Sequence, residues 1–164
     1  MAGDYEVRFI RDDGVEPELV APLLQWLVAR GADEFTVTVM ALEDMQAPFA
    51  DAFEDELEEF EKADAVRMLP SSSFGEEPTR SVRLWALDEE SLPILLSYLE
   101  DGLFELAPGP DGWLEDLAIF RKGELVLGVV SHEREGVLRL TAREHEQVAA
   151  LGVRATREAE WISY

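Results

Sequence analysis

The stretch DLAIFRKGELVLGVVSHEREGVLRLT, residues 116–141, decides how this chain folds. It contains three runs rich in Leu, Ile and Val, which favour β-strands, separated by two short polar connections. Lys122-Gly123 is a typical two-residue hairpin turn, because glycine adopts positive φ easily. The second connection, residues 132–136, is longer. The stretch therefore predicts an antiparallel three-stranded meander in the C-terminal part of the chain.

Other segments upstream have the apolar–polar alternation or the β-branched content of strands. We predict strands over residues 5–11, 35–42, 65–69 and 81–87. Helical spacing of apolar residues predicts a helix up to Gly31, either kinked at Pro22 or beginning near Ala21. A second helix is predicted over residues 92–101.

The meander is followed by a clear helix start. Thr141 with Glu144 three residues later forms a capping box, and Val148 and Leu151 give the helix an apolar side. The chain ends with two aromatic residues, Trp161 and Tyr164, which we expect to pack on the core or to form a final strand.

These elements predict an α+β protein, a single domain over residues 1–164. The expected sheet is mixed, ends in the C-terminal three-stranded antiparallel meander, and has about four helices packed against it. Residues 5–42 and 81–120 share a strand–helix order, which indicates either a weak internal repeat or simply an order of elements that is common in α/β-type proteins. Residues 70–79, rich in Ser, Pro, Gly and Glu, are predicted to form a mobile loop.

The net charge of −22, from 36 acidic and 14 basic residues, sets limits on the partners. It opposes binding to nucleic acid and to anionic membranes, both of which attract positive surfaces. It favours solubility, or steering towards a basic protein partner. Two other origins of the acidity stay open: the composition of a GC-rich genome and adaptation to high salt.

The most acidic segment is PFADAFEDELEEFEKAD, residues 48–64. A turn of 100° per residue brings Phe49, Phe53, Leu57 and Phe60 together on one side of a helix, opposite a wide acidic arc. The pattern predicts that the helix ends near Ala63. The residues that we predict to bind a partner are Asp51, Glu54, Asp55, Glu58, Glu59 and Glu61.

Motifs for catalysis and for metals or cofactors are absent from the sequence. It has no cysteine, no phosphate-binding or dinucleotide-binding glycine motif, and two histidines, His132 and His145. Ser131, His132 and Glu133 are consecutive, and in an extended chain they point alternately to opposite faces, so they do not assemble a triad. We expect His145 to be exposed. We predict no cofactor and no metal.

The composition and the missing motifs predict a non-enzymatic, acidic interaction protein of the bacterial cytoplasm, since no signal peptide or membrane span is evident. The expected partner is a basic protein. It could be a nuclease-like toxin neutralised by an immunity protein, or a DNA-binding protein for which the carboxylates act as a nucleic-acid mimic. One alternative is a small enzyme or small-molecule-binding domain with a pocket near His132 and Glu133. Another is a subunit that binds through Trp161 and Tyr164. The oligomeric state does not follow from the sequence.

Overall fold

A computed structural model describes residues 4–41, 48–71, 77–104, 112–158, 162 and 164. These residues form an α+β structure in which seven strands make one sheet of order β1-β7-β6-β5-β2-β4-β3. All the pairings between these strands are antiparallel, so the prediction of a mixed sheet was wrong, and the sheet is larger than expected.

The strands are β1 (Tyr5–Arg11), β2 (Glu34–Ala41), β3 (Glu61–Met68), β4 (Thr79–Ala86), β5 (Gly112–Arg121), β6 (Glu124–Val130) and β7 (Glu135–Thr141). The helices are α1 (Pro17–Ala29), α2 (Pro48–Leu57), α3 (Leu92–Ser97) and α4 (Ala142–Ala150). Three short 3₁₀ turns are η1 (Asp12–Gly14), η2 (Glu58–Phe60) and η3 (Ser131–Glu133).

The predicted meander is present as β5, β6 and β7. Lys122 and Gly123 both have positive φ, 53° and 78°, as a two-residue turn between twisted strands requires. The capping box at the start of α4 is confirmed, with reciprocal hydrogen bonds between Thr141 and Glu144. β1 then pairs with β7 at one edge of the sheet.

Two expected helix ends and one of the two alternative starts of α1, near Ala21, differ from the structure. The helix predicted over residues 92–101 ends at Ser97. α1 begins at Pro17, where a proline suits the first turn, and it continues through Pro22. α2 ends at Leu57 instead of near Ala63, because the chain passes through η2 and Glu61 already pairs with β4. The backbone hydrogen bonds of that ladder replace the ones that a longer helix would supply.

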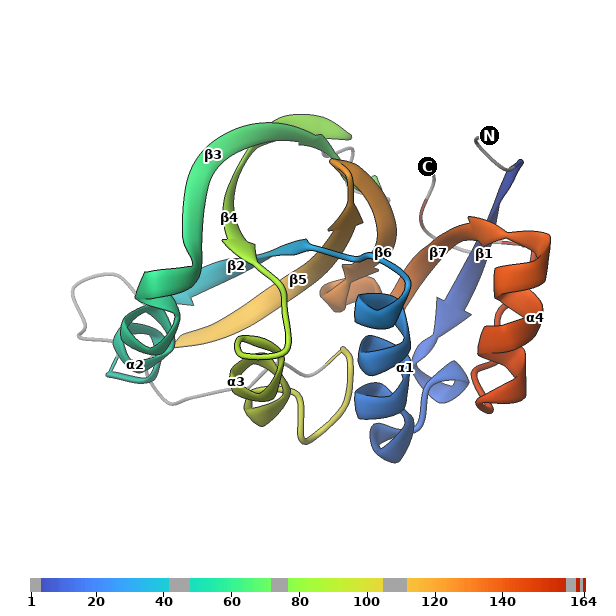
Figure 1. Ribbon diagram of the computed structural model, residues 1–164, viewed down its shortest axis with the longest axis horizontal. Coiled ribbons are helices and arrows are strands. Elements are labelled where there is room, and N and C mark those ends of the chain that lie inside the picture. The colour runs from blue at the N-terminus through green and yellow to red at the C-terminus, as the bar shows by residue number, and fades with distance from the viewer. Residues whose placement is uncertain (1–3, 42–47, 72–76, 105–111, 159–161, 163) are drawn as a thin grey trace.

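The sheet curls, so that its two faces bury two separate cores (Figure 1). The helices α1, α2 and α3 cover the first face, where Phe35, Trp85 and Leu127 belong to the larger core. In Figure 1, β3 and β4 arch away from β2 and bend back towards β6. The smaller core lies inside this curl and includes Leu84 and Phe120.

Closure of the curl depends on Gly128 in β6. A Cβ atom at this position would lie 2.8 Å from Cδ of Pro70, at the end of the arch, which is closer than atoms can approach. The absent side chain therefore lets the arch pack directly against β6.

The last residues return to the sheet. Phe9 and Thr156 exchange two backbone hydrogen bonds, and Ile162 is buried in the smaller core. Tyr164 is 42% exposed, so it is not a core residue, and Trp161 lies outside the described residues. The part of the predicted loop at residues 72–76 also lies outside them.

Candidate partner-binding surface

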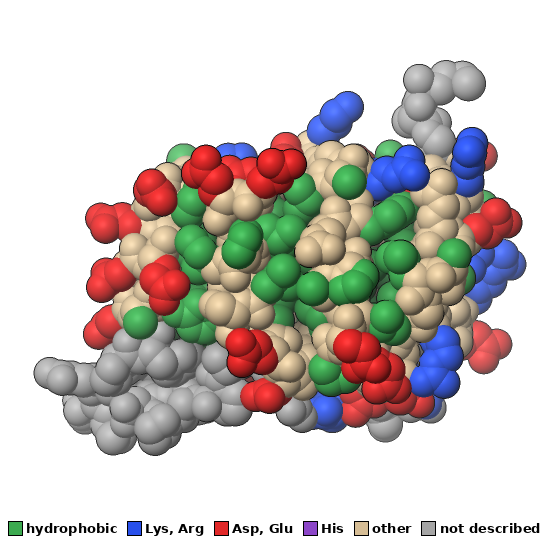
Figure 2. Space-filling model, turned by 60° about the horizontal axis from the view of Figure 1, so that its bottom comes forward, with side chains coloured by type: hydrophobic (Ala, Val, Ile, Leu, Met, Phe, Trp, Pro, Cys, Tyr) green, Lys and Arg blue, Asp and Glu red, His purple; other side chains and the backbone are tan. Residues whose placement is uncertain are grey.

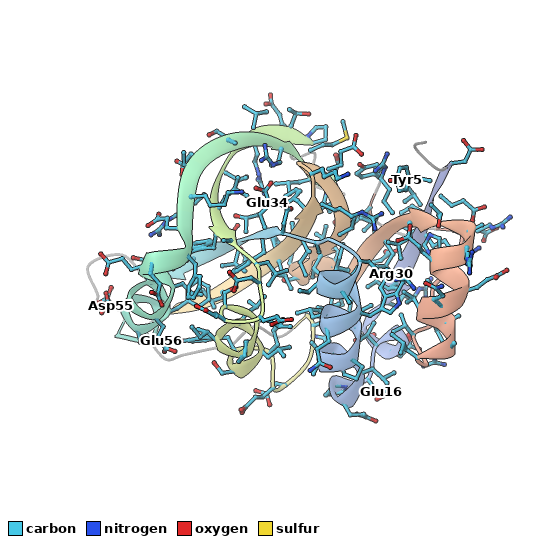
Figure 3. The ribbon with its side chains drawn as sticks, in the orientation of Figure 1. Tyr5, Glu16, Arg30, Glu34, Asp55 and Glu56 are labelled. Atoms are coloured by element: carbon cyan, nitrogen blue, oxygen red, sulfur yellow. The ribbon has the colours of Figure 1, made fainter. Side chains whose placement is uncertain are left out.

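All six acidic residues of the predicted binding surface lie on α2, η2 and the first residue of β3. Four of them are exposed and form no ion pair within the described chain; they are Asp51, Asp55, Glu58 and Glu59. We call these four residues the α2 acidic surface. Figure 3 labels Asp55 on this helix, at one end of the molecule.

Glu54 and Glu61 differ from the other four, because both bind Arg83 of β4. The Arg83 guanidinium lies 2.6 Å from Glu61 and 3.0 Å from Glu54. The hydrogen bond from Arg83 lowers the pKa of Glu61, and the bonds to both carboxylates raise the pKa of Arg83. The predicted surface is thus divided into two carboxylates that hold the arch to α2 and four that face solvent.

The apolar side of α2 fixes the direction of the acidic surface. Phe53 and Leu57 are fully buried, as the helical pattern predicted, and Phe53 makes edge-to-face contacts with Trp85 and Tyr98. These ring contacts fix the rotation of the helix, because turning it would expose two large apolar side chains. The carboxylates opposite them therefore point away from the core.

Glu56 is the acidic residue of this helix that contacts the end of α3. The Tyr98 hydroxyl donates a 2.8 Å hydrogen bond to it, and burial together with this carboxylate raises the pKa of Tyr98. This contact positions α3 beside the α2 acidic surface.

The buried carboxylate of Glu34 in β2 forms ion pairs with two nearby cations. Its side chain is 4% exposed and lies 2.7 Å from both Lys62 and Arg67 of β3. Burial alone would raise the pKa of Glu34, but the hydrogen bonds from these two cations outweigh it and lower the pKa. Figure 3 places Glu34 under the arch, away from α2. The sequence reasoning missed this site, whose only signal was an acid at the start of an apolar strand.

These contacts leave the α2 end of the molecule negative. β3 and β4 carry four cations, of which Lys62, Arg67 and Arg83 bind carboxylates other than the α2 acidic surface. Figure 2 shows acidic side chains along the α2 side of the helical face and along its lower edge, apolar side chains across its middle, and most of the visible basic side chains on the side away from α2. Other exposed acids without an ion pair among the described residues lie near α1 and α3, for example Glu16, Glu18 and Glu89, so the α2 acidic surface is one of several negative regions.

Comparison with known proteins gives no match: no family model, curated protein or solved structure is similar to this chain. Within the described residues, no group of three or more His, Asp or Glu side chains is arranged to hold a metal ion. No helix in that part of the chain has the length and apolar character needed to cross a membrane.

The alternative site at His132 and Glu133 lies on η3. Because Ser131, His132 and Glu133 form a 3₁₀ turn, the alternation expected of an extended chain was wrong. His132 Nε2 lies 3.9 Å from Glu133 Oε1, and neither residue lines any of the four main cavities formed by the described part of the chain. A cavity does lie near η3, but its walls come mostly from β2, β4 and β5.

The second histidine, His145, was expected to be exposed and is buried. Its Nε2 lies 2.9 Å from the carbonyl oxygen of Glu6, and burial lowers the pKa of His145. The prediction failed because the neighbouring Glu144 and Glu146 are polar, while His145 itself lies on the side of α4 that packs against the sheet. His145 is therefore a structural residue that joins α4 to β1.

Proposed function

We propose that this chain is a non-enzymatic protein that binds a basic protein partner through the α2 acidic surface. The observation that supports the proposal is the pairing pattern at this end of the molecule. Nearby cations bind Glu34, Glu54 and Glu61, and Asp51, Asp55, Glu58 and Glu59 are left facing solvent.

The physical basis is electrostatic steering. Exposed carboxylates without neighbouring cations produce a negative potential that extends about 8 Å into physiological salt. Such a potential raises the rate of encounter with a basic surface and disfavours acidic competitors. Because Asp51 and Asp55 lie on a helix anchored by Phe53 and Leu57, and η2 follows it directly, a partner meets the four carboxylates in a fixed arrangement.

The partner class that suits this surface is a protein with a basic cleft for nucleic-acid phosphates. A row of carboxylates imitates the charge of a phosphate backbone, so it competes for such a cleft. A nuclease-like toxin is one example, and an immunity protein of the bacterial cytoplasm is then the role of this chain.

The proposal is tested with two variants that lose the same number of negative charges at different places on the surface. In one variant, Asp51→Asn, Asp55→Asn, Glu58→Gln and Glu59→Gln neutralise the α2 acidic surface. In the matched control, Asp4→Asn, Glu18→Gln, Glu146→Gln and Glu158→Gln remove four exposed carboxylates that lie elsewhere in the chain. Both variants lose the same total charge.

The readout is the association rate with a nuclease domain that has a basic active-site cleft, measured by stopped-flow fluorescence from about 50 to about 500 mM salt. We expect the α2 variant to associate at least about tenfold more slowly at low salt and the control to stay within about twofold of the parent protein. Equal losses in the two variants, or association that does not depend on salt, would refute the proposal.

A further inference from the structure

The curled sheet has a second feature, a cavity between β2 and β4 that the partner-binding proposal does not use. These strands pair at Glu34↔Ala86 and Phe35↔Trp85 and then separate. The gap holds a cavity of about 190 Å³, whose lining includes Thr36, Thr38 and Asp116. A smaller cavity adjoins it, since Leu69, Arg80 and Asp116 line both.

Arg80 is the residue of this cavity that is best suited to bind a ligand. Along β4 it has the same parity as Val82 and Leu84, which belong to the smaller core or pack against it, so its side chain faces the inside of the curl. It is partly buried, and the described part of the chain supplies it with no hydrogen bond and no ion pair. A partly desolvated guanidinium gains from an added acceptor, because its five N–H donors lose part of their hydration.

Asp116 lies on the other side of the cavity in a fixed position. Its Oδ1 accepts a 2.8 Å hydrogen bond from the Ser131 backbone N–H, and its own N–H donates to the Ser131 hydroxyl at 2.9 Å. Its φ of 57° is in the left-handed region, which Asp tolerates better than most residues. A carboxylate has about four acceptor positions, so it can bind a ligand donor together with its partners in the protein.

The rest of the wall combines small hydroxyls with apolar side chains. The Thr36 hydroxyl donates to the Arg83 carbonyl oxygen, so it is held in place and its lone pairs are available as acceptors. Thr38 and Ser81 add two more hydroxyls, and Leu69 and Val82 supply apolar surface. The volume is below the about 300–1,000 Å³ of sites for drug-sized ligands, so the ligand must be small.

We propose that this cavity binds a small zwitterion of the size of a free amino acid, with its carboxylate on Arg80 and its ammonium group on Asp116. A charged guanidinium pairs well with a carboxylate, with two parallel hydrogen bonds. The net charge of −22 opposes the entry of a free anion such as phosphate, whereas a zwitterion is neutral overall. This site is independent of the α2 acidic surface, which lies on other elements.

The test is titration calorimetry on the full chain with a defined set of probes. L-Alanine, L-serine and L-valine carry both groups, propionate carries the carboxylate alone, ethylamine carries the amine alone, and inorganic phosphate is the competing anion. We expect at least one amino acid to bind with a dissociation constant below about 10 mM, more tightly than the other three probes. Tightest binding by phosphate, or no binding of any amino acid, would overturn the proposal.

Variants separate the two contacts. Arg80→Gln is expected to weaken amino-acid binding at least about tenfold, while Arg143→Gln, the same change at an exposed arginine of α4, leaves it unchanged. Asp116→Asn keeps an acceptor for the Ser131 N–H, and asparagine tolerates positive φ. This variant should weaken the binding of amino acids but not the binding of propionate. Circular dichroism confirms that each variant is folded. Unchanged amino-acid binding in folded Arg80→Gln would contradict the assignment.

Discussion

The two ends of the sheet differ in how many of their carboxylates form ion pairs. At the end formed by β1, β7 and α4, acids pair with arginines: Glu144 with Arg121 at 2.8 Å, and Glu124 with Arg139 at 3.2 Å. At the α2 end, the cations bind Glu34, Glu54 and Glu61, and the α2 acidic surface is left without a cation among the described residues. The arginines of the first end therefore neutralise Glu144 and Glu124, whereas the α2 acidic surface has no such partner among the described residues.

Net charge is therefore a poor guide to a surface until the ion pairs are known. Composition alone is compatible with an even acidic coat for solubility. The ion pairs add which carboxylates are neutralised: the cations near α2 bind Glu34, Glu54 and Glu61, and the four carboxylates of the α2 acidic surface, like exposed acids near α1 and α3, have no ion pair among the described residues.

The largest expected effect comes from removing the buried carboxylate at the α2 end. Glu34→Gln leaves Lys62 and Arg67 without their shared anion under the arch. We expect a loss of about 2–4 kcal/mol in the free energy of unfolding, measured by urea denaturation. Glu144→Gln, the counterpart at the α4 end, is expected to cost about 1 kcal/mol, because a glutamine still accepts hydrogen bonds from Arg121 and from the N-cap.

The same variant has a defined pH dependence. The pKa of Glu34 is lower in the folded chain than its ordinary value of 4.5, so its stabilisation is fully present above about pH 4.5 and is lost as the pH falls through the folded value. The stability difference between the parent protein and Glu34→Gln should therefore be constant from about pH 5 to about pH 8 and shrink at lower pH. A difference that grows on acidification would contradict the ion-pair interpretation.

A smaller effect is expected from releasing the two paired carboxylates, Glu54 and Glu61. Arg83→Gln frees both and so makes the α2 end more negative. We expect association with a basic nuclease domain to become severalfold faster at low salt. The stability loss should stay below about 1 kcal/mol, since the three side chains are about a third or more exposed. Slower association in a folded variant would mean that Arg83 itself contacts the partner.

The sequence predicted those elements in which local and tertiary preferences agree. The meander, the Lys122-Gly123 turn, β1 and the capping box of α4 were all recognised, because each has a strong local pattern. The end of α2 was misplaced, because Glu61 and Lys62 look helical and are drawn into a strand by pairing with β4 and by the ion pair to Glu34. Tertiary contacts overrode propensity there.

The sequence selected the six acidic residues of the proposed site but did not reveal their ion pairs. The helical pattern identified the acidic arc of α2, yet it gave no sign that Arg83 neutralises Glu54 and Glu61 from 29 and 22 residues away. The cavity between β2 and β4 was also missed, because the separation of two strands has no local sequence pattern. Both failures concern contacts between residues that are distant in the chain.

NMR on the ¹⁵N-labelled chain tests, residue by residue, whether the α2 acidic surface binds a cation-rich partner. An oligo-arginine peptide serves as a generic polycation and is titrated at low salt while the amide shifts are followed. We predict the largest shifts at Asp51, Asp55, Glu58 and Glu59, fading as salt approaches about 1 M, where the screening length is about 3 Å. Largest shifts on α4 and β1, or equal shifts over all exposed acids, would show that the binding surface lies elsewhere or does not exist.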